Sequence, residues 1–166
     1  MNRSPYSFEV MSRKHEDAVI RIFNYFVLNS FANYFEEPVS SDFFDRFMEM
    51  ARGYPSLVAK DHTGEVVGVA FMRSYHPAST FRRTAEIIYF ILPEHTRKGL
   101  GTALLKRLID DAKAQGIDTI LASISSKNEP SLRFHRKHGF RECGHFEAVG
   151  KKFGEDFGVV WMRLRL

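Results

Sequence analysis

The stretch Thr84–Asp111 limits the possible folds of this chain more than any other part of its sequence. It begins with a run of branched and aromatic residues, Ile87–Leu92, which Pro93 ends, and such a run is typical of a β-strand. A short polar turn leads to two basic residues and two glycines, and from Ala103 onward apolar residues recur at helical spacing. The sequence therefore predicts a strand, a glycine-containing turn and a helix, with the glycines at the helix N-terminus.

The glycine-containing turn, Arg97–Thr102, has the features of an anion site. A helix N-terminus carries unpaired N–H groups and a partial positive charge. Glycine lets the backbone approach a phosphate closely, and Arg97 and Lys98 add positive charge. The spacing matches neither a Walker P-loop nor a Rossmann fingerprint, whose third glycine is replaced by Leu104. Two interpretations remain, a pyrophosphate cradle and an ordinary strand-to-helix turn with solvated basic residues.

Composition and chain length predict one domain, residues 1–166, in the reducing cytoplasm. A hydrophobic content of 44% is sufficient for one core. No apolar run approaches the length of a membrane span, and Met1–Pro5 lacks the apolar segment of a secretory signal. The single cysteine, Cys143, excludes an internal disulfide framework. We therefore expect a cytoplasmic protein that has no membrane partner.

The net charge of +4 is spread along the chain and suits either nucleic acid or an anionic cofactor. The sequence contains neither zinc-finger spacing nor an aromatic-basic RNA motif. The seven histidines are scattered, and no pair has helical metal-ligand spacing in an acidic setting. We therefore expect no nucleic-acid partner and no metal.

Helical and β patterns alternate along the rest of the chain, without a repeat or a linker. The segment Asn29–Phe35 mixes amides with aromatics, so it either lines a pocket or packs as a helix end on the core. A polar, aromatic and basic loop is expected at Arg73–Arg83, where guanidinium groups can meet a substrate carboxylate. The further strands are expected at Ser7–Met11, Leu57–Lys60, Val66–Met72, Thr119–Ile124, from Phe140 and at Phe157–Leu166, and the helices after Ser12, at Phe43–Ala51 and at Ser131–His138.

These motifs resemble those of the GCN5-related N-acetyltransferases. In that family a Gln/Arg-x-x-Gly-x-Gly/Ala loop holds the pyrophosphate of coenzyme A, and the pattern falls on Thr96–Gly101, with Thr96 in the place of Gln or Arg. The segment Asn128–Phe140 resembles a second family motif. The closest likeness within the family is to the phosphinothricin and methionine sulfoximine branch, at Thr84–Glu86 and at Gly150–Gly154.

The resemblance implies an α/β (α+β) fold with a mixed, mostly antiparallel, splayed sheet flanked by helices. It also implies acetyl-CoA as the co-substrate, and a homodimer, because family members are often dimers. The contacts to acetyl-CoA that it implies come from Tyr89, Phe90, Ile91, Thr96, Arg97, Lys98, Gly99, Leu100, Gly101, Thr102, Asn128 and Ser131. The backbone N–H groups of Tyr89–Ile91 would bind pantetheine and the thioester carbonyl, and one of them could stabilise an oxyanion.

Amide formation from a thioester needs a neutral amine and a protonated leaving thiolate. A carboxylate can take the proton of the ammonium group, and the resemblance gives this role to Glu86, whose alternative is a surface position on an edge strand. His135 stands where most relatives have the tyrosine that protonates the thiolate. An imidazole can donate that proton near neutrality, or His135 only orients the pantetheine. The expected substrate contacts are Arg73, Phe81, Arg82, Arg83 and Thr84.

The sequence thus predicts an N-acetyltransferase that transfers acetyl to the primary amine of a small amino-acid-like substrate by direct attack in a ternary complex. The alternatives are an enzyme for peptide or protein N-termini and a non-catalytic acyl-CoA-binding module, against which Glu86 argues. Asp156–Gly158 replaces a Trp-Leu-Asp or Trp-His-Asp element of the branch, which predicts a preference for a bulkier or more cationic amine than phosphinothricin. In a shifted alignment, Asp156 would instead take the role of the family Asp.

Overall fold

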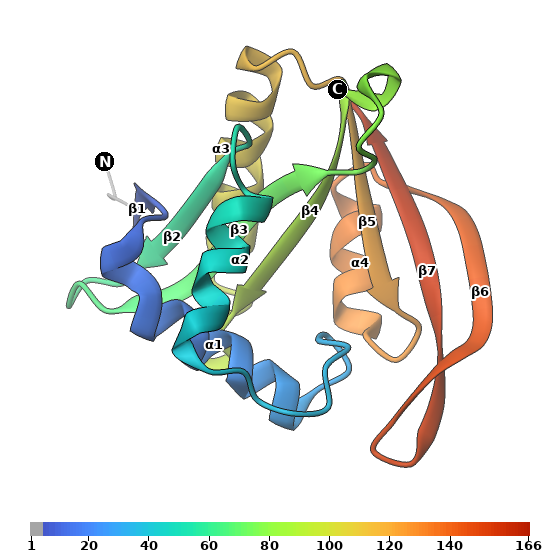
Figure 1. Cartoon of the computed structure of the whole chain (residues 1–166), viewed down its shortest axis with the longest axis horizontal. Coiled ribbons are helices and arrows are strands. Elements are labelled where there is room, and N and C mark those ends of the chain that lie inside the picture. The colour runs from blue at the N-terminus through green and yellow to red at the C-terminus, as the bar shows by residue number, and fades with distance from the viewer. Residues whose placement is uncertain (1–4) are drawn as a thin grey trace.

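The computed structural model describes residues 5–166. Residues 1–4, which belong to the expected domain and to the segment Met1–Pro5, lie outside the described residues. One sheet has the strand order β1-β2-β3-β4-β5-β7-β6 (Figure 1). Its strands are β1 (Ser7–Val10), β2 (Ser56–Lys60), β3 (Val66–Ser74), β4 (Thr84–Ile91), β5 (Thr119–Ser125), β6 (Arg141–Lys152) and β7 (Glu155–Arg165). The helices are α1 (Glu16–Asn29), α2 (Phe44–Met50), α3 (Leu100–Ala114) and α4 (Glu129–Lys137), with short 3₁₀ turns at Arg13–His15, Ser41–Phe43, Ser79–Phe81 and Pro93–His95.

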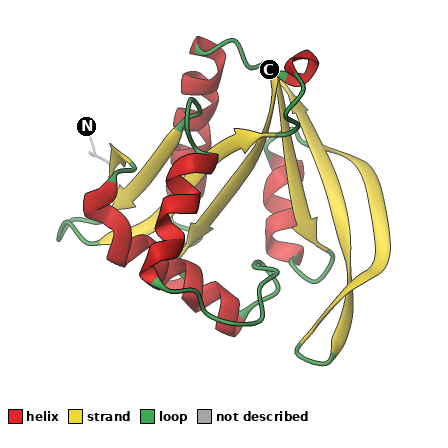
Figure 2. Cartoon of the chain, in the orientation of Figure 1, coloured by secondary structure: helices red, strands yellow, loops and turns green. Residues whose placement is uncertain are grey.

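Neighbouring strands pair antiparallel except β4 and β5, which are parallel. Helices cover both faces of the sheet (Figure 2). This arrangement confirms the expected mixed, mostly antiparallel sheet flanked by helices.

The sheet splays between β4 and β5 (Figure 1). Their pairing is confined to Thr84–Glu86 on β4 and Thr119–Leu121 on β5. Beyond that point β5 stays paired with β7 along its whole length, while β4 stays in register with β3 as far as Ile91. The two halves of the sheet therefore separate toward the carboxyl ends of β4 and β5, as the resemblance implied.

Strand alternation distributes the side chains of β4 between two apolar layers. Ile87 belongs to the layer that packs α3 and α4 on the sheet, together with Leu104 and Leu132. Phe90 belongs to the layer beneath α1 and α2, together with Phe47. Successive side chains of β4 thus face different helices, which decides what each can do in the site.

The expected loop at Arg73–Arg83 begins later than predicted and ends where it was predicted. Arg73 and Ser74 extend β3, and β4 begins at Thr84, three residues before the apolar run. The reason is a cross-strand pair: Arg73 lies opposite Glu86 and forms an ion pair with it. Without its partner, Arg73 looks like part of a loop, and Glu86 looks like a residue just before the strand.

Candidate active site

The turn between β4 and α3 has the geometry expected of an anion cradle. Gly99 is the N-cap of α3 in the left-handed conformation (φ 85°), and Arg97 also has a positive φ of 58°. A Cβ on Gly101 would lie 3.3 Å from the ring of Phe134 on α4, so this glycine lets α3 pack closely against α4. The predicted glycines at a helix N-terminus are confirmed, with the exposed side chains of Arg97 and Lys98 beside them.

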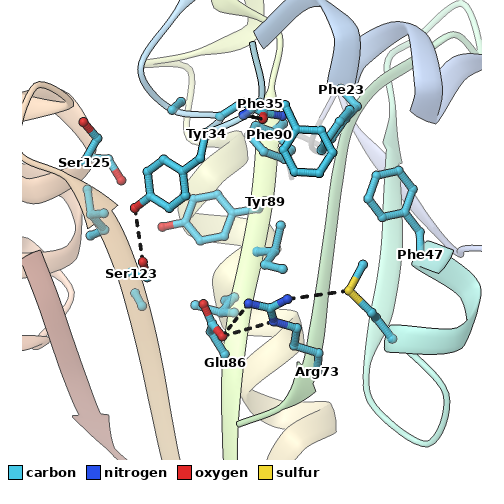
Figure 3. A pocket seen from close by; sticks show the side chains of 18 of the residues that line it. Phe23, Tyr34, Phe35, Phe47, Arg73, Glu86, Tyr89, Phe90, Ser123 and Ser125 are labelled. Atoms are coloured by element: carbon cyan, nitrogen blue, oxygen red, sulfur yellow. Dashed lines mark hydrogen bonds and ion pairs between the residues drawn. The ribbon is translucent and has the colours of Figure 1, made fainter. Parts of the chain in front are cut away.

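A cavity of about 690 Å³ lies where β4 and β5 separate (Figure 3). One wall is made by β4 from Glu86 to Phe90, and the opposite wall by β5 from Ala122 to Ser125. The helix α4 and its N-cap contribute three polar side chains to the lining, Asn128, Ser131 and His135. The splay thus exposes polar groups from three separate segments to one space.

Aromatic side chains of α1 and α2 form the apolar end of the cavity. Phe23 of α1 makes an edge contact with Phe47 of α2, with centroids 5.0 Å apart, and a further edge contact with Phe90. The helical spacing of these residues indicates core, and the structure shows that the same rings also border the cavity. Arg46, Glu49 and Met50 line it from α2, and sequence reasoning did not single them out.

The structure brings some of the predicted site residues together and leaves others apart. Glu86, Arg73, Tyr89, Phe90, Asn128, Ser131 and His135 line the cavity. The lining does not include Ile91, the cradle residues 96–102, Thr84, Phe81, Arg82 or Arg83. Among the predicted substrate contacts, Arg83 forms an ion pair with Asp118, and Phe81 packs with Tyr75 and His76. Arg73 is therefore the predicted substrate contact that borders this cavity.

The Glu86 carboxylate is buried, with 8% of the residue exposed, and it is held from one side. Nε and Nη2 of Arg73 both donate to Glu86 Oε2, at 3.0 and 2.8 Å (Figure 3). Within residues 5–166, no hydrogen bond engages Oε1. A paired and oriented carboxylate with one open oxygen can accept a proton from a group in the cavity.

The segment between α1 and α2 does line the pocket, which decides the question left open for Asn29–Phe35. Its Tyr34 hydroxyl lies 3.1 Å from Ser123 Oγ on β5. Burial raises the pKa of Tyr34. The structure thus adds Tyr34 and Ser123 to the candidate site, and the mixture of amides and aromatics was the sequence signal for this segment.

A buried lysine of β6 holds this segment in place. Lys152 is 1% exposed, and its Nζ donates to the backbone oxygens of Ser30 and Asn33 at 2.8 and 2.7 Å. Desolvation lowers the pKa of Lys152. Sequence reasoning treated this lysine only as part of a motif, because nothing local indicates carbonyl partners more than a hundred residues away.

The His135 ring has a defined tautomer. Its Nδ1 lies 2.7 Å from the Ser131 backbone oxygen, and because a carbonyl can only accept, Nδ1 carries the proton. Its Nε2 then accepts from the Tyr89 hydroxyl at 2.6 Å. Burial, opposed by the Ser131 bond and assisted by His138, lowers the pKa of His135 to about 4. The imidazole is therefore neutral at pH 7, which fits an orienting role better than that of proton donor.

This lowered pKa predicts that the fold loses stability in mild acid. Between pH 6.5, the ordinary value, and about pH 4, the unfolded chain binds a proton at His135 that the folded chain does not bind. The free energy of unfolding should therefore decrease as the pH falls through this window. Urea denaturation at several pH values gives the free energy of unfolding as a function of pH. Its slope against pH should be flatter for His135→Gln than for the parent. His62→Gln, which replaces an exposed turn histidine, is the control and should keep the parent's slope. If the free energy of unfolding of His135→Gln depends on pH as steeply as that of the parent, the prediction is wrong.

The residues expected to alter substrate choice lie at the far end of the β6–β7 hairpin. Asp156 forms an ion pair with Lys151 at 3.8 Å, its side chain is 65% exposed, and it is absent from the lining of the cavity. Phe157 stacks on Tyr34 at 5.6 Å. Within Asp156–Gly158, Phe157 is therefore the residue that contacts the site, because it stacks on Tyr34.

In residues 5–166, none of the helices has the length and apolar character needed to cross a membrane. No group of three or more His, Cys, Asp or Glu side chains in that range is arranged to hold a metal ion.

Comparison with known proteins agrees with this geometry. A model of the acetyltransferase (GNAT) family matches residues 22–140. The chain is 40% identical, over 152 residues, to the L-methionine sulfoximine/L-methionine sulfone acetyltransferase of Pseudomonas aeruginosa, covering 89% of this chain and 87% of the relative. It is 35% identical to an L-amino acid N-acyltransferase of Escherichia coli, with 90% and 87% covered.

Among solved structures, the chain is similar to a phosphinothricin acetyltransferase from Sinorhizobium meliloti in complex with acetyl-CoA. The TM-score is 0.92 at 28% identity, and the match covers 98% of this chain and 89% of the other. The family model and the relatives each span well over half of the sequence. The chain therefore belongs to the GNAT family of acetyltransferases.

Proposed function

We propose that the protein transfers acetyl from acetyl-CoA to the primary amine of a small amino-acid-like substrate, by direct attack in a ternary complex. The observation that carries this proposal is the buried Glu86 carboxylate, which has one oxygen open to a cavity between splayed strands. The names of the relatives support a small amino acid as the acceptor, because they include methionine sulfoximine, phosphinothricin and L-amino acid acyltransferases.

The residues of the β4–α3 turn fit a pyrophosphate. Gly99 in the left-handed conformation and the first N–H groups of α3 offer backbone donors, and Arg97 and Lys98 provide positive charge. Asn128 and Ser131 line the cavity at the start of α4, where an amide and a hydroxyl suit the amide groups of pantetheine. The bound co-substrate would supply an activated acetyl thioester.

Glu86 is the proposed base. The acceptor reaches the enzyme as an ammonium ion, and Glu86 Oε1 would take one of its protons, directly or through a water molecule. Arg73 fixes the carboxylate by two bonds to the other oxygen, so the open oxygen keeps its orientation. Backbone N–H groups of β4 beyond Glu86, where β4 has left β5, would stabilise the oxyanion.

The aromatic end of the cavity is the proposed site for the acceptor side chain. Rings from α1 and α2 form this wall, and Arg46 adds a cation that can meet a carboxylate. The expected preference for a more cationic amine rested on Asp156, which lies outside the cavity and is paired with Lys151. We therefore attribute substrate choice to the aromatic wall.

We also propose that the enzyme acts in the cytoplasm as a homodimer. The free thiol of Cys143 suits a reducing compartment. The outer strand β6 exposes Phe146 and Val149, and Phe153 in the following turn is also exposed. Such apolar side chains on an edge strand suit contact with a second copy, and sedimentation velocity tests this proposal.

The proposed reaction can be tested with a panel of amines. We expect free coenzyme A to be released from acetyl-CoA in the presence of L-methionine sulfoximine, L-methionine sulfone, phosphinothricin or unmodified amino acids, measured with a thiol reagent. The N-acetylated form of each amine should give no release above background, because it has no amine to attack. Faster turnover of short peptides than of any amino acid would favour an N-terminal acetyltransferase. Acetyl-CoA binding without turnover of any amine would favour a binding module.

A further inference from the structure

The side chain of Tyr89 takes no part in the proposed deprotonation of the amine or in the stabilisation of the oxyanion. Its ring stacks on the His135 ring, with centroids 5.5 Å apart and planes at 21°. Its hydroxyl lies 2.6 Å from His135 Nε2, and both residues line the cavity. The Tyr89 hydroxyl therefore places a phenolic O–H donor next to the proposed reaction centre.

Strand alternation places Tyr89 and Glu86 on opposite faces of β4. Glu86 is paired with Arg73, whose guanidinium also contacts Met50 of α2 at 3.6 Å. Tyr89 instead packs with the layer beneath α3 and α4, against Phe134 and His135. The base therefore faces the α2 side, and the Tyr89 hydroxyl faces the side that carries the cradle.

This arrangement matches the two ends of the reaction. The cradle at the start of α3 packs directly against α4 through Gly101 and Phe134, so coenzyme A belongs on the α3–α4 side. The sulfur is the point at which the coenzyme joins the acetyl group, and it would leave toward that side. The amine meets the acetyl carbon from the other side, where Glu86 lies.

His135 lacks a free proton for the sulfur. Its Nδ1–H donates to the Ser131 carbonyl, and its Nε2 is an acceptor. The neighbouring hydroxyl of Tyr89 does carry a proton, and rotation about the Cζ–Oη bond can redirect it. Burial raises the pKa of Tyr89, so the hydroxyl stays protonated throughout the usual assay range.

We propose that the Tyr89 hydroxyl turns its hydrogen from His135 Nε2 to the coenzyme A sulfur as the thiolate departs, and that His135 is the positioning residue, because its ring stacks on the ring of Tyr89. This inference rests on the proposed function. When the carbon–sulfur bond breaks, its electron pair moves to sulfur. The amine nitrogen loses two protons in forming the amide, of which Glu86 takes one and the sulfur receives the other. Tyr89 stabilises the charge on sulfur and keeps its own proton.

The first test is a binding experiment that needs no amine. Calorimetry at about pH 9.5, where thiols ionise, compares coenzyme A with desulfo-coenzyme A. A hydrogen bond to a charged group is typically worth a factor of roughly 10 to 100. Tyr89→Phe should weaken the binding of coenzyme A by about that factor and leave desulfo-coenzyme A unchanged, because the ring and its packing remain. Tyr34→Phe removes another cavity hydroxyl, from the α1–α2 segment, and should keep the parent's ratio.

The second test is kinetic. Tyr89→Phe should lower kcat with acetyl-CoA by roughly 10- to 100-fold, with both KM values nearly unchanged, since the hydrogen bond strengthens only as charge develops. His135→Gln should reduce the same binding ratio, as expected for a positioning residue. If Tyr89→Phe keeps both the parent's kcat and its ratio, the inference is wrong while the proposed function stands. If the parent binds no coenzyme A or acetylates no amine, the proposed function fails first.

Discussion

Replacing Glu86 with glutamine should lower kcat by on the order of 10²–10⁴ while the Kd for acetyl-CoA stays within about twofold. Glutamine has the same shape, and its oxygen can still accept the two bonds from Arg73. The amide cannot take a proton from the acceptor ammonium, so the fraction of neutral amine in the site falls. Steady-state thiol release gives kcat, and calorimetry with acetyl-CoA gives Kd.

The cavity offers a matched control for this substitution. Glu49 of α2 is a second carboxylate in the lining, and Glu49→Gln removes the same charge from the same space. Its kcat should stay within a few-fold of the parent. The deficit of Glu86→Gln should also shrink as the pH rises, because solvent then supplies more neutral amine. A Glu86→Gln enzyme that turns over at nearly the parental rate would mean that the base lies elsewhere.

Features of the site that depend on neighbouring residues were predictable from the sequence. The position of Gly99 and Gly101 at a helix start follows from residues within one turn of them, and the structure places both there. The helix expected at Ser131–His138 is α4, which Asn128 caps and which has Pro130 in its first turn, and Gly116 follows the end of α3 with a positive φ. Local backbone conformation decides each of these positions, and the sequence displays it directly.

Features that depend on contacts between distant segments were not predictable. The Glu86 carboxylate was expected just before a strand. Its partner Arg73 lies 13 residues away across a hairpin, so no neighbouring residue indicates the pair that extends the strand. Tyr34 and Ser123 are separated by 89 residues, and Tyr89 and His135 by 46. Lys152 reaches carbonyls 119 and 122 residues earlier. Such pairs are set by the sheet order, which places β5 between β4 and β7 and cannot be read from local patterns.

The cradle assignment predicts that Gly99→Glu abolishes acetyl-CoA binding. Gly99 has a φ of 85°, which disfavours any side chain, and a carboxylate at the N-terminus of α3 would repel the pyrophosphate. For the parent, acetyl-CoA at about a hundredfold excess over Kd should raise the free energy of unfolding by about 2.7 kcal/mol. The variant should gain nothing measurable, in calorimetry or in thermal melting with the ligand.

Gly64→Glu separates the cradle from the strain of the substitution. Gly64 lies in the β2–β3 turn with a φ of 87°, and, as at Gly99, a Cβ there would meet no atom within 4 Å. Both variants therefore place the same charged side chain on a left-handed residue, and both should lose similar stability without ligand. Gly64→Glu should still bind acetyl-CoA as the parent does, because Gly64 lies in a strand-to-strand turn and not at the N-terminus of a helix. If Gly99→Glu binds as tightly as Gly64→Glu, the pyrophosphate does not lie on the β4–α3 turn. Gly99 then serves only the turn itself, and Gly101 only the packing of α3 against α4.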